Sequence, residues 1–395
     1  MAATSPPRLL TLILISGLSV GSLNLFLPSL PQIAADFKAD YGLVNLSIAG
    51  FAAATAILQL IMGPLSDRYG RRPVILICIL IFIAASIGCA LAPNVWAFLG
   101  FRMVQAVIAS GYAVSLAVIR DTRPPEEAAS VMGYLASAWA IAPMLGPVLG
   151  GLMDEWFGWR SNFWLFAGLG VAAFALVWAD LGETNRHRTA DLTSQFRAYP
   201  ELFRSRRFWG YTLCAASSIG GFYVFLGGAP LVAAGNFPLS TAALGVAMGT
   251  ITVGFIVGSF LVGRYGRRFP LTTTITTGRI VAAVGLAGGL VIVSAGIVGP
   301  ITFFGACMFL GLGNGLTMPG SNSGALSVRP KLAGSAAGLS ASVTVAGAAL
   351  VSAFAGAVTT KENAAWAVLA IMLSSVLFGL AAALYVRWVD RREAQ

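Results

Sequence analysis

The sequence has little charge and few of the residues that carry catalytic chemistry. Only 10% of its 395 residues are charged, and it has a single histidine, His187, which lies in a polar stretch. A zinc enzyme or a serine hydrolase would therefore lack ligands or a general base. The four cysteines, Cys78, Cys89, Cys214 and Cys307, lie in apolar runs without CxxC spacing, so they suggest neither disulfides nor a metal site. No GxxxxGK[ST] loop is present, which argues against ATP as an energy source. We expect no cofactor, no metal and no enzymatic activity.

Long apolar segments fill most of the chain instead, and its mean hydropathy is +0.82. A membrane-spanning helix needs about 20 apolar residues to cross about 30 Å of hydrocarbon. We predict an all-α integral membrane protein with twelve transmembrane helices, and its 46 glycines suit helices that pack closely in lipid. The first segment has no small-residue cleavage site, so we interpret it as a retained span. The predicted spans are 9–33, 44–66, 73–93, 96–120, 128–152, 161–181, 208–234, 241–263, 270–293, 299–321, 334–358 and 363–386.

The basic residues gather on one side of the predicted membrane. With a cytoplasmic N-terminus, 20 of the 25 Lys and Arg residues fall in cytoplasmic segments. The opposite side has Lys38, Arg160 and Lys361, and two arginines, Arg102 and Arg279, lie within spans. This positive-inside asymmetry predicts that both termini are cytoplasmic and that the number of spans is even. It also accounts for the net charge of +10 without a nucleic-acid partner.

A charged pentapeptide, RYGRR, occurs at 68–72 and again at 264–268, always between two apolar runs. The offset of 196 residues is close to half of the 395-residue chain. Positive-inside bias explains arginines at such a corner, but it does not explain a repeated pentapeptide. The repeat predicts two parallel six-helix bundles that are pseudo-symmetric and enclose a substrate site between them, a known transporter plan. We place the bundles at 1–181 and 208–395, joined by a cytoplasmic linker at 182–207, which could be plain linker or contain an interfacial helix.

Several motifs resemble those of the major facilitator superfamily. GPLSDRYGRR at 63–72 is similar to its loop between helices 2 and 3, and 102–121 resembles the fourth-helix motif of its proton-coupled members. APMLGPVLGG at 142–151 resembles the fifth-helix motif of exporters, with alanine in place of the first glycine. LFLPSLPQIAADF at 25–37 and GWRSNF at 158–163 resemble the bicyclomycin and chloramphenicol drug-export branch. The resemblance is strong over 1–181 and weaker in the second half.

The resemblance implies a latch at the cytoplasmic face. Asp67 would meet the N-terminal end of a second-half helix, while Asp121 accepts Arg68 or Arg71, which holds the outward-open state. The second copy has Gly263 where Asp67 would be, so only the first should latch strongly. Alternatively, Asp67 is a solvated loop acid or a helix cap. The predicted latch residues are Gly63, Asp67, Arg68, Gly70, Arg71, Arg72 and Asp121.

Two further motifs concern helices 4 and 5. Arg102 lies inside a span, where a cation is expensive and functional by default, although it could also snorkel to the surface. In helix 5, prolines delete backbone hydrogen bonds and glycines give a smooth packing face. The resemblance associates that face with export. The residues of this antiporter motif are Pro143, Gly146, Pro147, Gly150 and Gly151.

The acidic residue that relatives usually carry in helix 1 is Asn24 here, in NLFLP, and asparagine cannot exchange a proton near neutral pH. Three alternatives stay open. Asp36, at the outer end of helix 1, could titrate, or Asp121 or Asp67 could carry the proton on the inner side. Transport could also be uncoupled from protons, or driven by the gradient of the substrate itself.

A cavity with an arginine and no carboxylate suits neutral or anionic compounds better than lipophilic cations. We therefore predict an exporter of a drug-like amphipathic small molecule, for example a phenicol-type antibiotic, in a bacterial inner membrane. It would work by rocker-switch alternating access as a monomer, with protons as a possible coupling ion. The alternative is efflux of an endogenous metabolite or organic anion; a receptor or enzyme is disfavoured. Candidate substrate-binding residues are Asn24, Arg102, Gln105, Tyr112, Trp139, Tyr223 and Asn314.

Overall fold

The computed structural model describes residues 7–123, 125–185, 199–237, 239–329 and 333–393, and every regular element in these ranges is helical. The elements of the first half are α1 (Leu9–Asn24), η1 (Leu27–Ser29), α2 (Leu30–Asp36), α3 (Tyr41–Tyr69), α4 (Arg71–Ala90), α5 (Val95–Gln105), η2 (Ala106–Ala109), α6 (Ser110–Thr122), α7 (Pro125–Phe157) and α8 (Arg160–Asp180). Those of the second half are α10 (Tyr199–Phe203), α11 (Arg206–Asn236), α12 (Thr241–Tyr265), η3 (Gly266–Arg268), α13 (Leu271–Ser294), α14 (Pro300–Ser327), α15 (Ala333–Val358) and α16 (Ala364–Glu393).

Long apolar helices make up nearly the whole structure. Among the described residues, eleven stretches are long and apolar enough to cross a membrane. The 33-residue α7 is a further long helix, and many of its side chains lie outside the described residues. With α7 included, the order of helices follows the predicted order of spans. The prediction of an all-α membrane protein is confirmed.

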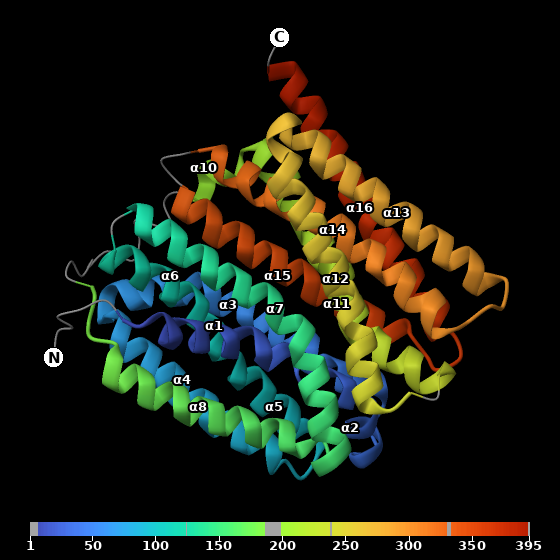
Figure 1. The fold of residues 1–395 in the computed structure, drawn as a ribbon, viewed down its shortest axis with the longest axis horizontal. Coiled ribbons are helices and arrows are strands. Elements are labelled where there is room, and N and C mark those ends of the chain that lie inside the picture. Colours follow the sequence, from blue (N-terminus) through green and yellow to red (C-terminus); the bar gives the residue numbers. More distant parts are fainter. Residues whose placement is uncertain (1–6, 124, 186–198, 238, 330–332, 394–395) are drawn as a thin grey trace.

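The helices pack as two groups, α1–α8 and α11–α16, coloured blue to green and yellow to red in Figure 1. Within the first group, α4 packs on α8 and α1 packs on α7; within the second, α14 packs on both α12 and α13. The two groups meet chiefly along two seams, where α7 lies against α12 and α3 lies against α15. These seams bring together helices from opposite halves of the chain.

Helix bounds differ from prediction where polar residues or prolines intervene. The predicted span 9–33 is interrupted after Asn24 by the short helix η1, which has Pro28 in its first turn. The predicted span 96–120 contains a 3-10 segment, Ala106–Ala109. The fifth helix continues to Phe157 rather than ending at 152, because backbone hydrogen bonding does not stop where apolar residues do. In the linker, α10 is a five-residue helix, and residues 186–198 lie outside the description.

Glycines let α12 and α14 approach backbone to backbone. A Cβ at Gly311 would overlap the main-chain carbonyl of Ile251, and one at Gly315 would overlap that of Phe255. Such close approach is how helices associate in lipid, where burial from water supplies no driving force between them. The second helix group therefore depends on small residues at this seam.

We predict that Gly311→Ala and Gly305→Ala have opposite effects, although both lie on α14. A Cβ at Gly311 meets backbone that cannot rotate away, and overpacking of this kind costs about 1–3 kcal/mol. A Cβ at Gly305 meets nothing within 4 Å, so alanine there should stabilise the helix by about 0.5–1 kcal/mol. Thermal melting of the purified protein in detergent measures both. Equal melting midpoints for the two variants would contradict the glycine-packed seam.

Candidate functional site

Arg71, the first residue of α4, is the centre of the corner formed by α3, α4 and α6. Its guanidinium forms ion pairs with Asp67, one turn earlier on α3, and with Asp121 on α6, the latter at 3.3 Å between Nε and Oδ2. It also donates to the hydroxyl of Ser66. Arg71 is only 9% exposed, so this charge is held by its partners rather than by water. One arginine thus ties three helices together at what we call the arginine-rich end, the end with both RYGRR corners.

Residues that follow α8 complete the corner. The carboxylate of Glu183 accepts the N–H of Arg71 at 3.0 Å, and the amide of Asn185 donates to the carbonyl of Asp67 at 2.7 Å. Gly70 reverses the chain between α3 and α4 with a φ of +105°, a conformation that side chains rarely adopt. The described contacts of Asp67 therefore all lie within the first half of the chain, and the latch between halves stays a prediction.

The other two arginines of the motif are placed differently. Arg68 is exposed and lies against the neighbouring tyrosine ring. Arg72 donates to the carbonyl of Trp178 at 2.9 Å and stacks on its ring, 5.2 Å from the centroid. Of the two partners considered for Asp121, the structure therefore selects Arg71.

Arg102, on α5, is completely buried inside the first helix group. Its Nη1 donates to the carbonyl of Ser22 at 3.1 Å and to the side-chain oxygen of Gln105. The amide nitrogen of Gln105 in turn donates to the hydroxyl of Ser86 at 2.7 Å. The alternative in which Arg102 snorkels to the surface is wrong. Among the described residues, neutral oxygens hold this cation, and no carboxylate forms an ion pair with it.

Aromatic rings supply the remaining stabilisation of Arg102. Its guanidinium carbon lies 4.3 Å from the ring centroid of Phe26, 4.7 Å from that of Phe51 and 5.9 Å from that of Phe163. The negative face of an aromatic ring attracts a cation most strongly where water is excluded. Two of its nitrogens, Nε and Nη2, have no hydrogen-bond partner among the described residues.

A second buried arginine, Arg279 on α13, occupies the other helix group. Its Nε donates to Thr317 at 3.0 Å and its Nη2 to the side-chain oxygen of Asn314 at 2.6 Å. Asn314 donates to the carbonyl of Ser218 at 3.0 Å. Ser22 and Ser218 are 196 positions apart, the offset of the two basic corners, and each lends its carbonyl to an arginine cluster. Sequence reasoning assigned Asn314 but not Arg279, although a cation within a span was the same signal that identified the first cluster.

The fifth-helix motif packs α7 against the first span. A Cβ at Gly150 would overlap the carbonyl of Leu25, and one at Gly146 would lie 3.1 Å from the Cβ of Asn24. Asn24, which is 2% exposed, donates to the carbonyl of Val20 on its own helix at 2.9 Å. This asparagine therefore lies at the junction with α7.

The remaining candidates are spread over the structure. Tyr112 on α6 and Tyr223 on α11 are half-buried. Asp36, at the end of α2, pairs with Arg160 at 2.5 Å and accepts from the Trp159 indole at 3.1 Å. The predicted residues whose side-chain surroundings lie outside the description are Gly63 and Trp139.

The α7–α12 seam joins the two groups through backbone. A Cβ at Gly151 would overlap the carbonyl of Thr241, and one at Gly245 would overlap that of Pro147. Both prolines of the motif, Pro143 and Pro147, lie inside α7, where neither offers an N–H. This contact lies near the end of the helices opposite the basic corners, the arginine-poor end.

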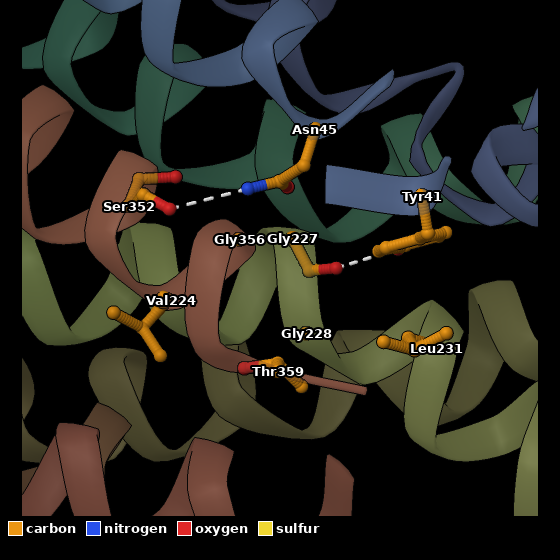
Figure 2. Close-up of a pocket in the computed structure, with 10 residues that line it drawn as sticks. Tyr41, Asn45, Val224, Gly227, Gly228, Leu231, Ser352, Gly356 and Thr359 are labelled. Atoms are coloured by element: carbon orange, nitrogen blue, oxygen red, sulfur yellow. Dashed lines mark hydrogen bonds between the residues drawn. The ribbon is translucent and has the colours of Figure 1, made fainter. Parts of the chain in front are cut away.

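The α3–α11–α15 junction lies toward the same end of the helices, and its contacts are shown in Figure 2. The Tyr41 hydroxyl donates to the carbonyl of Gly227 at 2.6 Å, and the Asn45 amide donates to that of Ser352 at 3.2 Å. These residues line a small pocket between the groups. A third hydrogen bond between the groups, from the Ser342 hydroxyl to the carbonyl of Ala56 at 3.0 Å, lies near the middle of α3. The described hydrogen bonds between groups thus run from mid-helix to the arginine-poor end.

The family model of the Major Facilitator Superfamily matches residues 12–352. The chain belongs to this superfamily. It is accordingly a multi-pass membrane protein of a transporter superfamily, and not an enzyme.

Relatives and solved structures agree with this placement. The chain is 36% identical over 245 residues to the "Chloramphenicol resistance protein" of Pseudomonas aeruginosa, a match that covers 61% of this chain and 58% of that protein. It is 26% identical to the "Bicyclomycin resistance protein homolog" of Haemophilus influenzae, covering 86% of each chain. A crystal structure of the peptide transporter POT in complex with sulfate shares the fold, with a TM-score of 0.80 at 15% identity over 98% of this chain and 97% of that one.

We predict that Arg71→Gln is strongly destabilising and that Arg68→Gln is not. Loss of Arg71 leaves two partly buried carboxylates without a cation, which costs about 1–3 kcal/mol. Arg68 is exposed, and surface changes are usually within about 0.5 kcal/mol. Thermal melting in detergent compares these matched arginines of one motif. If both variants melt alike, the corner does not depend on Arg71.

Proposed function

We propose that the protein exports a neutral or anionic amphipathic small molecule, such as a phenicol-type antibiotic, by alternating access. The observation that carries the proposal is the uneven distribution of contacts between the helix groups. Described hydrogen bonds that cross between them occur from mid-helix to the arginine-poor end, whereas the contacts of the arginine-rich corner stay within the first half. Contacts at one end alone suit two bodies that rock about a central site.

The proposed orientation follows from charge. The arginine-rich end faces the cytoplasm of a bacterial cell, with both termini there, because basic loops are retained on that side. The conformation described here is then closed toward the outside. We divide the chain as 1–181, 182–207 and 208–395, and propose a monomer in the inner membrane.

The substrate class is inferred from buried charge. Both spanning cations, Arg102 and Arg279, are completely buried, and among the described residues neither has an acidic partner. A transport pathway that has buried positive charges and no carboxylate to balance them does not attract lipophilic cations. The printed names of the Pseudomonas and Haemophilus relatives support antibiotics as cargo. Proton antiport is the proposed energy source, with Asp36 the candidate named from sequence.

A second candidate function is export of an organic anion. Unpaired N–H groups favour this candidate. No hydrogen-bond partner among the described residues is found for Nε and Nη2 of Arg102 or for Nη1 of Arg279. An anionic group could pair with such donors if a conformational change exposed them.

We expect expression of the protein in a strain that lacks it to raise resistance to chloramphenicol several-fold and to leave resistance to ethidium, a lipophilic cation, unchanged. The reason is the absence of an acidic partner for such a cation. Growth inhibition by a panel that also contains bicyclomycin and a carboxylated dye measures this. Protection against ethidium alone would refute the proposed substrate class, whereas export of the dye alone would select the organic-anion alternative.

We also expect Asp67→Asn to leave the protein folded and inserted while it largely abolishes transport. The change keeps the size of the side chain but removes the charge that the proposed latch needs in the outward-open state. Chloramphenicol efflux from cells, normalised to membrane-inserted protein, checks this. Asp180→Asn is a matched control, because Asp180 binds α1 at the same end without a role in the motif. Transport by Asp67→Asn at the wild-type rate would remove the latch.

A further inference from the structure

Asp154 is the one buried carboxylate among the described residues, at 5% exposed. The predicted fifth span, 128–152, ends two residues before Asp154, so the sequence did not indicate a buried acid there. In the structure α7 continues to Phe157, and Asp154 lies within its last turns, at the arginine-poor end. No role in the mechanism described above uses this residue.

Neutral polar side chains from the first span surround the carboxylate. The side-chain amide of Gln32 on α2 lies against this group: with its nitrogen toward Asp154 it donates to Oδ1 at 2.7 Å and to Oδ2, and with its oxygen toward Asp154 it accepts from the protonated carboxyl. The hydroxyl of Ser29 lies within hydrogen-bonding range of the same group. Ser29 accepts from the amide of Asn162 on α8 at 3.2 Å, and that amide also donates to the carbonyl of Gly150 at 3.3 Å. Three spans are thus joined around one acid.

Among the described residues, no cation forms an ion pair with Asp154. Glu155, on its own helix, is the charged group that acts on it, and the packed elements α2 and α8 carry Asp36 and Arg160. Arg160 and Asp36 pair with each other at 2.5 Å. On α12, the first turn has no acid, and the N–H of Ala242 is bound by Glu155 at 3.4 Å. A carboxylate buried among neutral groups and beside another acid is more stable when protonated.

The position of Asp154 couples it to the contact between helix groups. It lies three residues after Gly151, which packs on Thr241 of the second group, and four after Gly150, which packs on Leu25. Residues three and four apart share a helix face, so Asp154 lies where α7 meets both the first span and α12. Separation of α12 from α7 would admit water to this carboxylate, and hydration favours its charged form.

We propose that Asp154 is a protonation site linked to closure of the arginine-poor end. One proton from water on that side binds the carboxylate before α7 and α12 come together. It leaves toward the arginine-rich end, which is then the open one, before they part; no other bond changes. The inference rests on the proposed alternating access and deepens it, because it supplies the titrating group that Asn24 cannot be. It also replaces Asp36 as the leading candidate, since Asp36 already has a cation as its partner.

Infrared titration of the protein in lipid membranes tests the site without any substrate. We expect a protonated-carboxyl band that persists above the pH at which an exposed aspartic acid ionises and is lost as the pH rises further, because burial favours the protonated form. The band should be present in wild type, Glu155→Gln and Asp36→Asn, and absent in Asp154→Asn. If Asp154→Asn does not fold, Asp154→Glu should show the band at a shifted frequency. An unchanged band in the Asp154 variants, or no titrating band in wild type, would overturn the proposal.

Distance measurements test the link to closure. Spin labels at Trp156→Cys on α7 and Val246→Cys on α12 report the seam; both positions are exposed, and the four native cysteines are buried. In wild type, lowering the pH should increase the fraction of molecules in which the two labels are close together. In Asp154→Asn that population should dominate at every pH, while Glu155→Gln keeps the pH response. A pH response that survives in Asp154→Asn contradicts the link.

Chloramphenicol exchange across proteoliposomes without a pH gradient tests the proposed function separately. Exchange should persist in Asp154→Asn at a reduced rate, whereas accumulation driven by a pH gradient should be lost. Absence of exchange in wild type would count against phenicol export, and the titration and distance results would still decide the role of Asp154. Gradient-driven accumulation by Asp154→Asn equal to wild type would refute that role.

Discussion

Backbone-to-backbone approach at glycine is the contact on which the rest of this structure depends. In lipid, apolar side chains gain little by moving from acyl chains to a neighbouring helix, so association relies on fit and on hydrogen bonds. Gly150 lets α7 contact the carbonyl of Leu25, and Gly151 lets it contact that of Thr241 in the other group. One pair of adjacent glycines therefore sets both the packing of the first group and its seam with the second.

The same close packing explains how two arginines persist inside the bundles. Water is excluded around Arg102 and Arg279, which raises the cost of each charge but also strengthens every hydrogen bond to it. Carbonyls of the first and seventh spans, at Ser22 and Ser218, anchor the two clusters. Arg102 lies in the fourth span of the first group, whereas Arg279 lies in the third span of the second. The two halves therefore share a buried arginine cluster, but not the position of the arginine.

The architecture could be predicted from sequence because hydropathy and positive-inside bias act over long windows. Details that depend on single backbone groups could not be predicted in this way. The extension of α7 past its apolar residues was missed, and with it the burial of Asp154, because hydrogen bonding continues into polar sequence. The choice of Arg71 over Arg68 as the partner of Asp121 depends on the turn at Gly70, which periodicity does not specify. A cation within the fourth span was predictable, but its ring partners were not: they come from the turn after α1, from α3 and from α8, while its amide partner Gln105 lies on its own helix.

The two basic corners have diverged in a way that bears on how the halves move. In the first, Arg71 binds two carboxylates, and the chain turns directly from α3 into α4. In the second, Gly263 replaces the acid, a 3-10 turn follows α12, and Arg268 lies 5.8 Å from the ring of Tyr265. Asp67 is held by its own corner in this structure, so the proposed latch requires it to exchange partners before it binds the other half. In the proposed rocking motion, closure at one end and a latch at the other are alternatives, since a rotation that brings one pair of surfaces together separates the other.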